Sequence, residues 1–198
     1  MNKRKFKRIE IPKDVNVNTL SPLEISCGTT KCSDDFHCFS LKRTSIKNFN
    51  KTGVCKNCGS DLIDWKRIHK KDLSDVNFVF SSLKKELFRH VIWHVEISPV
   101  AKKKALQLSP EQQREKTKSI MKKKIMKKGF RDGTQTPPGG NEITYYAQHA
   151  TATCCRKCIE VWYNIPEVQE LTEQQLDFFV DLALLFINEK IQSFSSDE

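Results

Sequence analysis

The spacing of its eight cysteines constrains this 198-residue chain more than any other feature of the sequence. Five of them lie between residues 27 and 58, and the other three lie within residues 154–158. We expect an intracellular, cytoplasmic protein, because no apolar stretch follows the basic N-terminus and no apolar run is long enough to span a membrane. In a reducing compartment, clustered cysteines are more often metal ligands or buried apolar residues than disulfides. The spacing therefore indicates metal binding.

The first group contains two close pairs of cysteines separated by a segment with β-like sequence. A tight turn lets two thiolates from one short loop bind the same Zn²⁺ ion, which takes four ligands in a tetrahedron. Gly59 directly after the second pair suits such a turn, where a positive φ is often needed. The pattern predicts a zinc-ribbon-like module over residues 25–65, with a structural ion bound by Cys27, Cys32, Cys55 and Cys58.

Other interpretations of the first group remain open. Cys38 can replace either cysteine of the first pair, and His37 is also available as a ligand. Buried free thiols without a metal, or a redox dithiol formed by Cys55 and Cys58, are the remaining alternatives.

The second group can combine with histidines from an earlier helix. A helical apolar stripe over residues 75–96 carries His90 and His94, four residues apart. A second helix, from about residue 149 to 165, would present two of the cysteines one turn apart. Packing of these helices would form a His2Cys2 zinc site from His90, His94 and two of Cys154, Cys155 and Cys158. Buried side chains without a metal, and an iron–sulfur cluster completed by His149, are the alternatives.

His149 is the candidate for catalysis. Its neighbours are small Ala and Thr residues, and we place it where a short extended piece over residues 143–146 meets a helix. Helix N-termini attract anions such as phosphate. A buried core or capping histidine is the alternative interpretation.

Charge is distributed unevenly. Residues 101–131 carry twelve Lys and Arg and two Glu, whereas residues 159–198 carry nine acidic residues and one Lys, although the whole chain has a net charge of +10. This predicts a basic face for a polyanion, with the acidic end facing elsewhere. A solvated lysine-rich helix is the simpler interpretation. The residues expected to contact phosphate are Lys122, Lys123, Lys124, Lys127, Lys128 and Arg131.

The fold class we expect is α+β and mostly α. Residues 1–24 form a basic arm, residues 25–65 the zinc-ribbon-like module, and residues 66–198 a helical domain. Within that domain we predict a helix over 109–128, with Ser109 as N-cap and Gly129 past its end, and another over 173–191, with Thr172 as N-cap. Short β-like pieces are expected at residues 36–39 and 62–65.

The C-terminal motifs resemble a known family. Three runs, Asp132–Pro137, Tyr146–Cys158 and Trp162 with Ile165-Pro166, are similar to a bacterial family catalogued as domain of unknown function 4186. The upstream motifs Cys55–Gly59, Asp64-Trp65 and Phe88-Arg89-His90 to Trp93-His94 resemble a longer branch of the same group, so the resemblance covers roughly residues 25–190. Members usually have Trp-His where this chain has Trp162-Tyr163, which puts a ligand role at position 163 in doubt. The family implies a shared fold and no reaction.

Three functions are compatible with these features. The first is a zinc protein with one or two ions whose basic surface binds or processes nucleic acid through phosphate contacts. The second is a metal-dependent hydrolase or base-processing enzyme centred on His149 and the cluster Cys154, Cys155 and Cys158. The third is a non-enzymatic module whose acidic last helix binds a protein partner.

Overall fold

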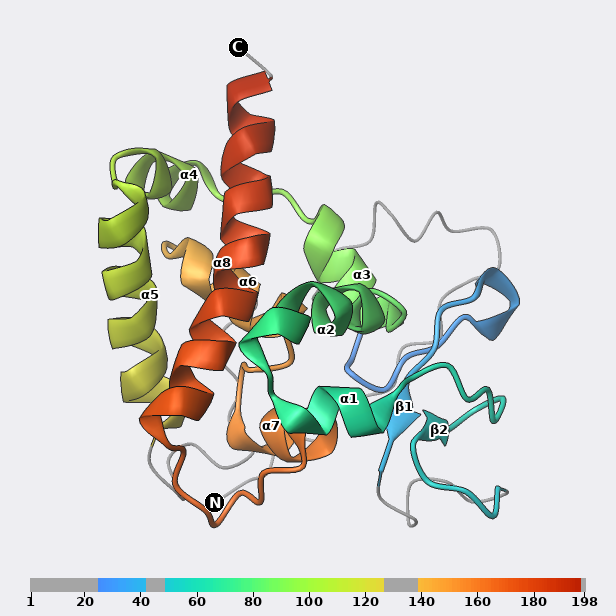
Figure 1. Ribbon diagram of the computed structural model, residues 1–198. Coiled ribbons are helices and arrows are strands. Elements are labelled where there is room, and N and C mark those ends of the chain that lie inside the picture. Colours follow the sequence, from blue (N-terminus) through green and yellow to red (C-terminus); the bar gives the residue numbers. More distant parts are fainter. Residues whose placement is uncertain (1–24, 42–48, 127–138, 197–198) are drawn as a thin grey trace, which may run out of the picture.

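A small hairpin carries the N-terminal cysteines, and helices make up most of the rest of the described chain (Figure 1). The computed structural model describes residues 25–41, 49–126 and 139–196. Strand β1 (Phe39–Ser40) pairs antiparallel with β2 (Val54–Cys55), and the 3-10 turn η2 (Cys32–Asp34) precedes them. Within these ranges the two strands form the only sheet, so the α+β, mostly α class is confirmed.

The last helix forms the centre of the core. Its apolar residues Phe178, Phe179, Leu182 and Phe186 have no exposed surface, and it packs against helices from both sides (Figure 1). No helix in the described ranges is both long enough and apolar enough to cross a membrane. The helices are α1 (Trp65–Lys70), α2 (Val76–Leu83), α3 (Leu87–His94), α4 (Pro99–Leu106), α5 (Pro110–Ile125), α6 (Ile143–Ala150), α7 (Arg156–Tyr163) and α8 (Glu173–Ser196), with the 3-10 turn η4 (Leu73–Asp75) between α1 and α2.

Two helix starts lie where the sequence predicts them. Ser109 and Gln112 form a reciprocal capping box at the start of α5. At the start of α8 the Gln175 backbone N–H donates to Thr172 Oγ1 at 3.1 Å, and the Gln175 side chain accepts from the Thr172 N–H at 3.0 Å. Such caps satisfy backbone donors that have no partner within the helix. The predicted end of α5 at Gly129 and the arm over residues 1–24 lie outside the described residues.

The single helix predicted over residues 75–96 is wrong. The chain forms α2 and α3 with a break at residues 84–86, where Glu86 has an extended backbone. The break lets the backbone pair with the module: the His37 N–H donates to Lys85 O, and the Leu87 N–H donates to His37 O. A contact distant in sequence thus overrides a continuous helical stripe.

The secondary structure around the second cysteine group also differs from the prediction. Residues 143–146 are the start of α6 rather than an extended piece, and the predicted helix over 149–165 is divided by a bend at residues 151–155. Ala152 has a positive φ of 55°, which interrupts the helix. The carbonyl of Thr151 accepts from the Tyr163 hydroxyl, so α7 folds back onto the bend. Residues 62–65 are not a strand, because Asp64 caps α1.

The module and the helices share one core. Ile25, Phe39 and Ile63 belong to the same apolar cluster as the buried residues of α8. The Trp162 ring of α7 lies 5.3 Å from the Trp65 ring and 6.4 Å from the Phe39 ring, measured between centroids. This docking brings the N-terminal cysteines beside α3 and α7.

Candidate metal centres

The first cluster consists of Cys32, His37, Cys55 and Cys58, whose ligand atoms all lie within 4.8 Å of one another. The Cys32 and Cys55 sulfurs are 3.8 Å apart, and Cys58 Sγ lies 3.4 Å from His37 Nδ1. Two thiolates bound to zinc at about 2.3 Å in a tetrahedron are about 3.8 Å apart. The described geometry therefore has the size of a zinc site, and these four residues can hold a metal ion.

Tight turns position these ligands. Cys55 ends β2, and the turn to Cys58 closes with a hydrogen bond from the Gly59 N–H to Cys55 O at 2.9 Å. Gly59 has a φ of 80°, and a Cβ there would lie 2.5 Å from the Phe49 ring. The predicted requirement for glycine after Cys58 is thus confirmed by both backbone conformation and space.

Neighbouring groups prepare two of these residues, His37 and Cys58, as ligands. His37 Nε2 lies 2.9 Å from Asp35 Oδ1, which leaves Nδ1 directed at the cluster. Metal-bound histidines commonly donate their second ring N–H to a carboxylate in this way. Burial opposes ionisation of Cys58, but hydrogen bonds from the Ser60 hydroxyl and backbone lower the pKa of this thiol to about 6. Zinc binds the thiolate form, so Cys58 is ready to bind near neutral pH.

The structure brings three of the four predicted first-site ligands together and puts His37 where Cys27 was expected. His37 was one of the alternatives that the sequence left open. Cys27 lies in neither this cluster nor the group of Cys154, Cys155 and Cys158, although its nearby thiol contributes to the raised pKa of the Cys158 thiol. Cys38, the other alternative, is buried and donates to the Cys27 carbonyl at 3.1 Å. All eight cysteines are free thiols.

The second cluster contains Cys154, Cys155 and Cys158, whose sulfurs also lie within 4.8 Å of one another. Cys154 and Cys155 lie in the bend before α7, and Cys158 lies in its first turn. All three are buried, and the Cys154 and Cys158 sulfurs are 3.5 Å apart. Hydrogen bonding to Cys154 and burial raise the pKa of Cys155 to about 12. The predicted grouping is present, although a bend and not one helix produces it.

His90 and His94 belong to neither cluster. Their rings are 4.4 Å apart at the end of α3, and His90 packs on Phe36 at 4.3 Å. Burial, with repulsion from His94 and Lys84, lowers the pKa of His90 to about 4. The structure therefore does not join this pair to the three cysteines as the predicted His2Cys2 site requires.

Two buried charged residues lie between the clusters, and the sequence analysis predicted a role for neither, although Arg89 lies in one of the family motifs. The Arg89 guanidinium lies 3.7 Å from Cys158 Sγ and donates to His149 O at 2.6 Å. Glu86 accepts from the Phe39 N–H and from Trp162 Nε1, both at 3.0 Å, and its carboxylate lies 3.4 Å from Arg89 Nε. These residues tie β1, α3 and α7 together. A charge in an apolar helical pattern was the only sequence signal for either residue.

His149 is fully buried in the last turn of α6, and not at an open strand-to-helix junction as expected. Its ring lies 5.8 Å from the Phe88 ring. Because the side chain has no exposed surface, a substrate could reach it only if neighbouring elements moved.

The acidic end of the chain does not face away from the basic segment. Arg114 of α5 pairs with Asp181 of α8, and Lys118 pairs with Asp177 at 2.6 Å. Lys122 likewise pairs with Glu173 at 2.5 Å. The predicted separation of charge is therefore wrong along this contact, because α5 and α8 pack side by side (Figure 1).

The other predicted phosphate contacts have different surroundings. Lys123 is exposed, and the Lys124 ammonium lies 5.6 Å from the centre of the Tyr145 ring. The remaining three, Lys127, Lys128 and Arg131, lie outside the described residues.

Comparison with known proteins identifies the helical part of the chain. No solved structure matches the chain. A family model described as Domain of unknown function (DUF4186) matches residues 77–188, which contain the second cluster, Glu86 and Arg89 but not the first cluster. The match spans more than half of the chain and confirms the resemblance of its C-terminal motifs, whereas the motifs before residue 77 lie outside it. The chain therefore belongs to the DUF4186 family and carries a further candidate metal cluster N-terminal to the family domain.

Proposed function

We propose that this protein binds a structural zinc ion through Cys32, His37, Cys55 and Cys58. The observation that supports this most strongly is the convergence of three sulfurs and one imidazole nitrogen within 4.8 Å. Three thiolates and an imidazole in a tetrahedron are a usual donor set for structural zinc. All four positions are filled by protein, which leaves none for a substrate.

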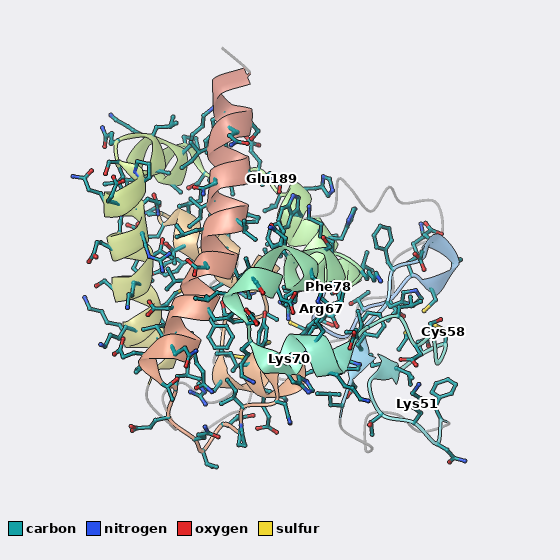
Figure 2. All side chains as sticks on the ribbon, in the orientation of Figure 1. Lys51, Cys58, Arg67, Lys70, Phe78 and Glu189 are labelled. Atoms are coloured by element: carbon teal, nitrogen blue, oxygen red, sulfur yellow. The ribbon has the colours of Figure 1, made fainter. Side chains whose placement is uncertain are left out.

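The zinc ion has a clear structural task. Each strand of the hairpin has two residues, and so short a sheet has little stability of its own. The ion joins η2, His37 two residues before β1, the end of β2 and the turn that follows it. In Figure 2, Cys58 lies with Lys51 on the outer side of the hairpin, away from α5. The metal thus stabilises the hairpin, which contacts the helical core on one side only.

Zinc content of histidine variants tests this proposal. After dialysis against a weak chelator, His37→Ala should lose one equivalent of zinc relative to wild type, and His37→Cys should retain it. His94→Ala is the matched control, since His94 lies outside both clusters. Equal zinc content in His37→Ala and His94→Ala would refute the site.

We further propose that the zinc-bound protein binds the phosphate backbone of nucleic acid. The net charge of +10 supports this, and so does the small excess of cations in the module, where residues 25–65 carry six Lys and Arg and four Asp. Lys123 is exposed near the end of α5, and no ion pair involves it within the described residues. Lysines contact phosphate without reading base sequence, so we expect little sequence preference. Lys122, Lys124, Lys127, Lys128 and Arg131 are the other contacts proposed.

Salt dependence of binding tests this second proposal. Fluorescence anisotropy with mixed-sequence single-stranded RNA and duplex DNA should show affinity that falls steeply with salt. Lys123→Gln should reduce the slope of log K against log salt by about 0.7 to 0.9, the contribution of one phosphate contact. Lys103→Gln, which removes the same charge from an exposed position of α4, should leave the slope unchanged. Absence of binding to either nucleic acid at low salt would contradict the proposal.

A further inference from the structure

A small pocket lies where the end of α3, the helix α4 and the end of α8 meet. Its volume is about 230 Å³, and the side chains that decide its chemistry are His94, Glu96, Ile97, Lys102, Lys190 and Phe194. In Figure 2 the labelled Glu189 marks the part of α8 that borders the pocket, because Lys190 follows it directly. The pocket lies outside both cysteine clusters, and none of the described lysines of α5 lines it.

The deeper lining of the pocket is apolar, and two lysines extend over it. Ile97 and Phe194 are 5% and 8% exposed. The Lys102 ammonium lies 4.7 Å from the centre of the Phe194 ring, and the Lys190 ammonium lies 5.8 Å from the centre of the Phe186 ring. Both distances are within the range of cation–π attraction. Aromatic rings of α8 thus hold ammonium groups from two different helices at one pocket.

Positive charge exceeds negative charge among the residues that line the pocket. Within the described residues neither Lys102 nor Lys190 forms an ion pair, whereas Lys104 of the same α4 pairs with Glu142 at 2.6 Å. Glu96 contributes the only carboxylate among the described residues of the lining. Two ammonium groups therefore share one pocket with a single exposed carboxylate.

The electrostatics of the neighbouring histidine agree with this positive charge. Burial, with repulsion from Lys190 and Lys84, lowers the pKa of His94. Burial likewise lowers the pKa of Lys190. A concave site lined by charges of one sign attracts ions of the opposite sign. An anion in the pocket would therefore stabilise both lysines in their charged form.

We propose that this pocket binds a phosphate monoester, or free phosphate, between Lys102 and Lys190. A phosphate monoester carries a charge of about −1.5 to −2 at pH 7, which matches two ammonium groups better than the single charge of a phosphodiester does. Lysine binds phosphate as a point charge. The volume is below the range of about 300 to 1,000 Å³ that is typical of pockets for larger ligands, so the phosphate group fills much of it. This site is separate from the proposed contacts with the nucleic acid backbone and does not depend on them.

Isothermal titration calorimetry of the full, zinc-loaded chain at low salt tests the proposal with three probes. These are inorganic phosphate, a dinucleotide with a 5′-phosphate, and the same dinucleotide without it. We expect one equivalent of each of the first two probes to bind, and the third to bind much more weakly. Tighter binding of the phosphorylated dinucleotide than of phosphate would identify a terminal phosphate as the ligand, and the reverse order would identify free phosphate. Equal affinity for the two dinucleotides, or no binding of either phosphate probe at millimolar concentration, would overturn the proposal.

Variants of the pocket test which residues bind the anion. Lys102→Gln and Lys190→Gln should each weaken phosphate binding about tenfold, the usual effect of losing one hydrogen bond to a charged group. Both lysines are partly exposed, so these variants should fold. Glu96→Gln removes the opposing charge and should tighten binding. Lys103→Gln, on the exposed side of α4, and Lys123→Gln, on α5, are the matched controls and should leave phosphate affinity unchanged.

The pattern across these variants separates this proposal from the one on nucleic acid. Unchanged phosphate affinity in both Lys102→Gln and Lys190→Gln, or weaker binding in Glu96→Gln, would overturn the pocket. A loss confined to Lys123→Gln would place the bound phosphate on α5 and would also overturn it. Phosphate binding that depends on Lys102 and Lys190 supports the pocket even where the chain binds no nucleic acid.

Discussion

Glu86 provides the sharpest test of how the module is held on the helical domain. Its carboxylate is 4% exposed and is shared by the Phe39 N–H, the Trp162 indole N–H and the Arg89 guanidinium. Glu86→Gln keeps the shape but replaces one acceptor oxygen by an NH2 donor and removes the charge opposite Arg89. At least one buried donor then has no acceptor, and the guanidinium loses its carboxylate.

The expected cost follows from these contacts. Removing one partner of a buried ion pair costs about 3 to 5 kcal/mol, and a buried donor without a partner about 1 to 3 kcal/mol. Because the site can relax partially, the two costs do not add in full. We therefore expect Glu86→Gln to lower the free energy of unfolding by about 4 kcal/mol. Such a loss is a large part of the 5 to 15 kcal/mol that typically separates folded from unfolded protein.

Glu189 is the matched control. It also accepts from an indole, Trp93 Nε1 at 2.9 Å, and lies near a lysine, but its side chain is 48% exposed (Figure 2). Water can replace its partners, so Glu189→Gln should cost no more than about 1 kcal/mol. Urea denaturation in the presence of zinc, followed by tryptophan fluorescence and circular dichroism, measures both losses. If the two variants lie within about 1 kcal/mol of each other, the reasoning from burial is refuted.

Three further predictions concern pH, metal and salt. The lowered pKa of His90, from 6.5 to about 4, means that the folded state binds fewer protons between these values, so stability falls as pH decreases through that window. When the pH is lowered from 7 to 5, the free energy of unfolding of His90→Phe should therefore fall by about 1 kcal/mol less than that of wild type, after allowance for solvent screening. Equal losses of stability in the two proteins would contradict the lowered pKa of His90. Removal of zinc by a chelator at pH 7 should lower the thermal unfolding midpoint, and added zinc should restore it; a midpoint that ignores the chelator would argue against a structural ion. Asp181→Asn breaks the half-exposed pair with Arg114 and should cost no more than about 1 kcal/mol in urea denaturation, with a smaller cost at high salt. The same cost at high salt would show that this pair is not screened.

Helix starts and the glycine turn were predicted well because nearby residues determine them. The capping residues at Ser109 and Thr172 fix where α5 and α8 begin, since the cap lies within three residues of the donors that it satisfies. Gly59 could be assigned a positive φ for the same reason. The three C-terminal cysteines were grouped correctly because they lie within five positions of one another.

Features that depend on distant contacts were not predicted correctly. The break between α2 and α3 arises because the His37 backbone pairs with residues 85 and 87, and a helical stripe carries no sign of that partner. The charge pattern suggested a free basic face, whereas packing of α8 against α5 pairs Arg114 and Lys118 with acidic residues.

Local sequence patterns are sufficient to predict that this chain is mostly helical, where α5 and α8 begin, and that its cysteines form two groups suited to metal. Which residue completes the first group depends on how distant segments pack together. His37 joins Cys32, Cys55 and Cys58, whereas Cys27 lies in neither group of possible ligands. The spacing of cysteines along the chain predicts only contacts between residues that belong to the same turn. The partners of Cys27, Glu86 and Arg89 depend on how the module packs against α3 and α7, where burial makes an unpaired charge or donor costly.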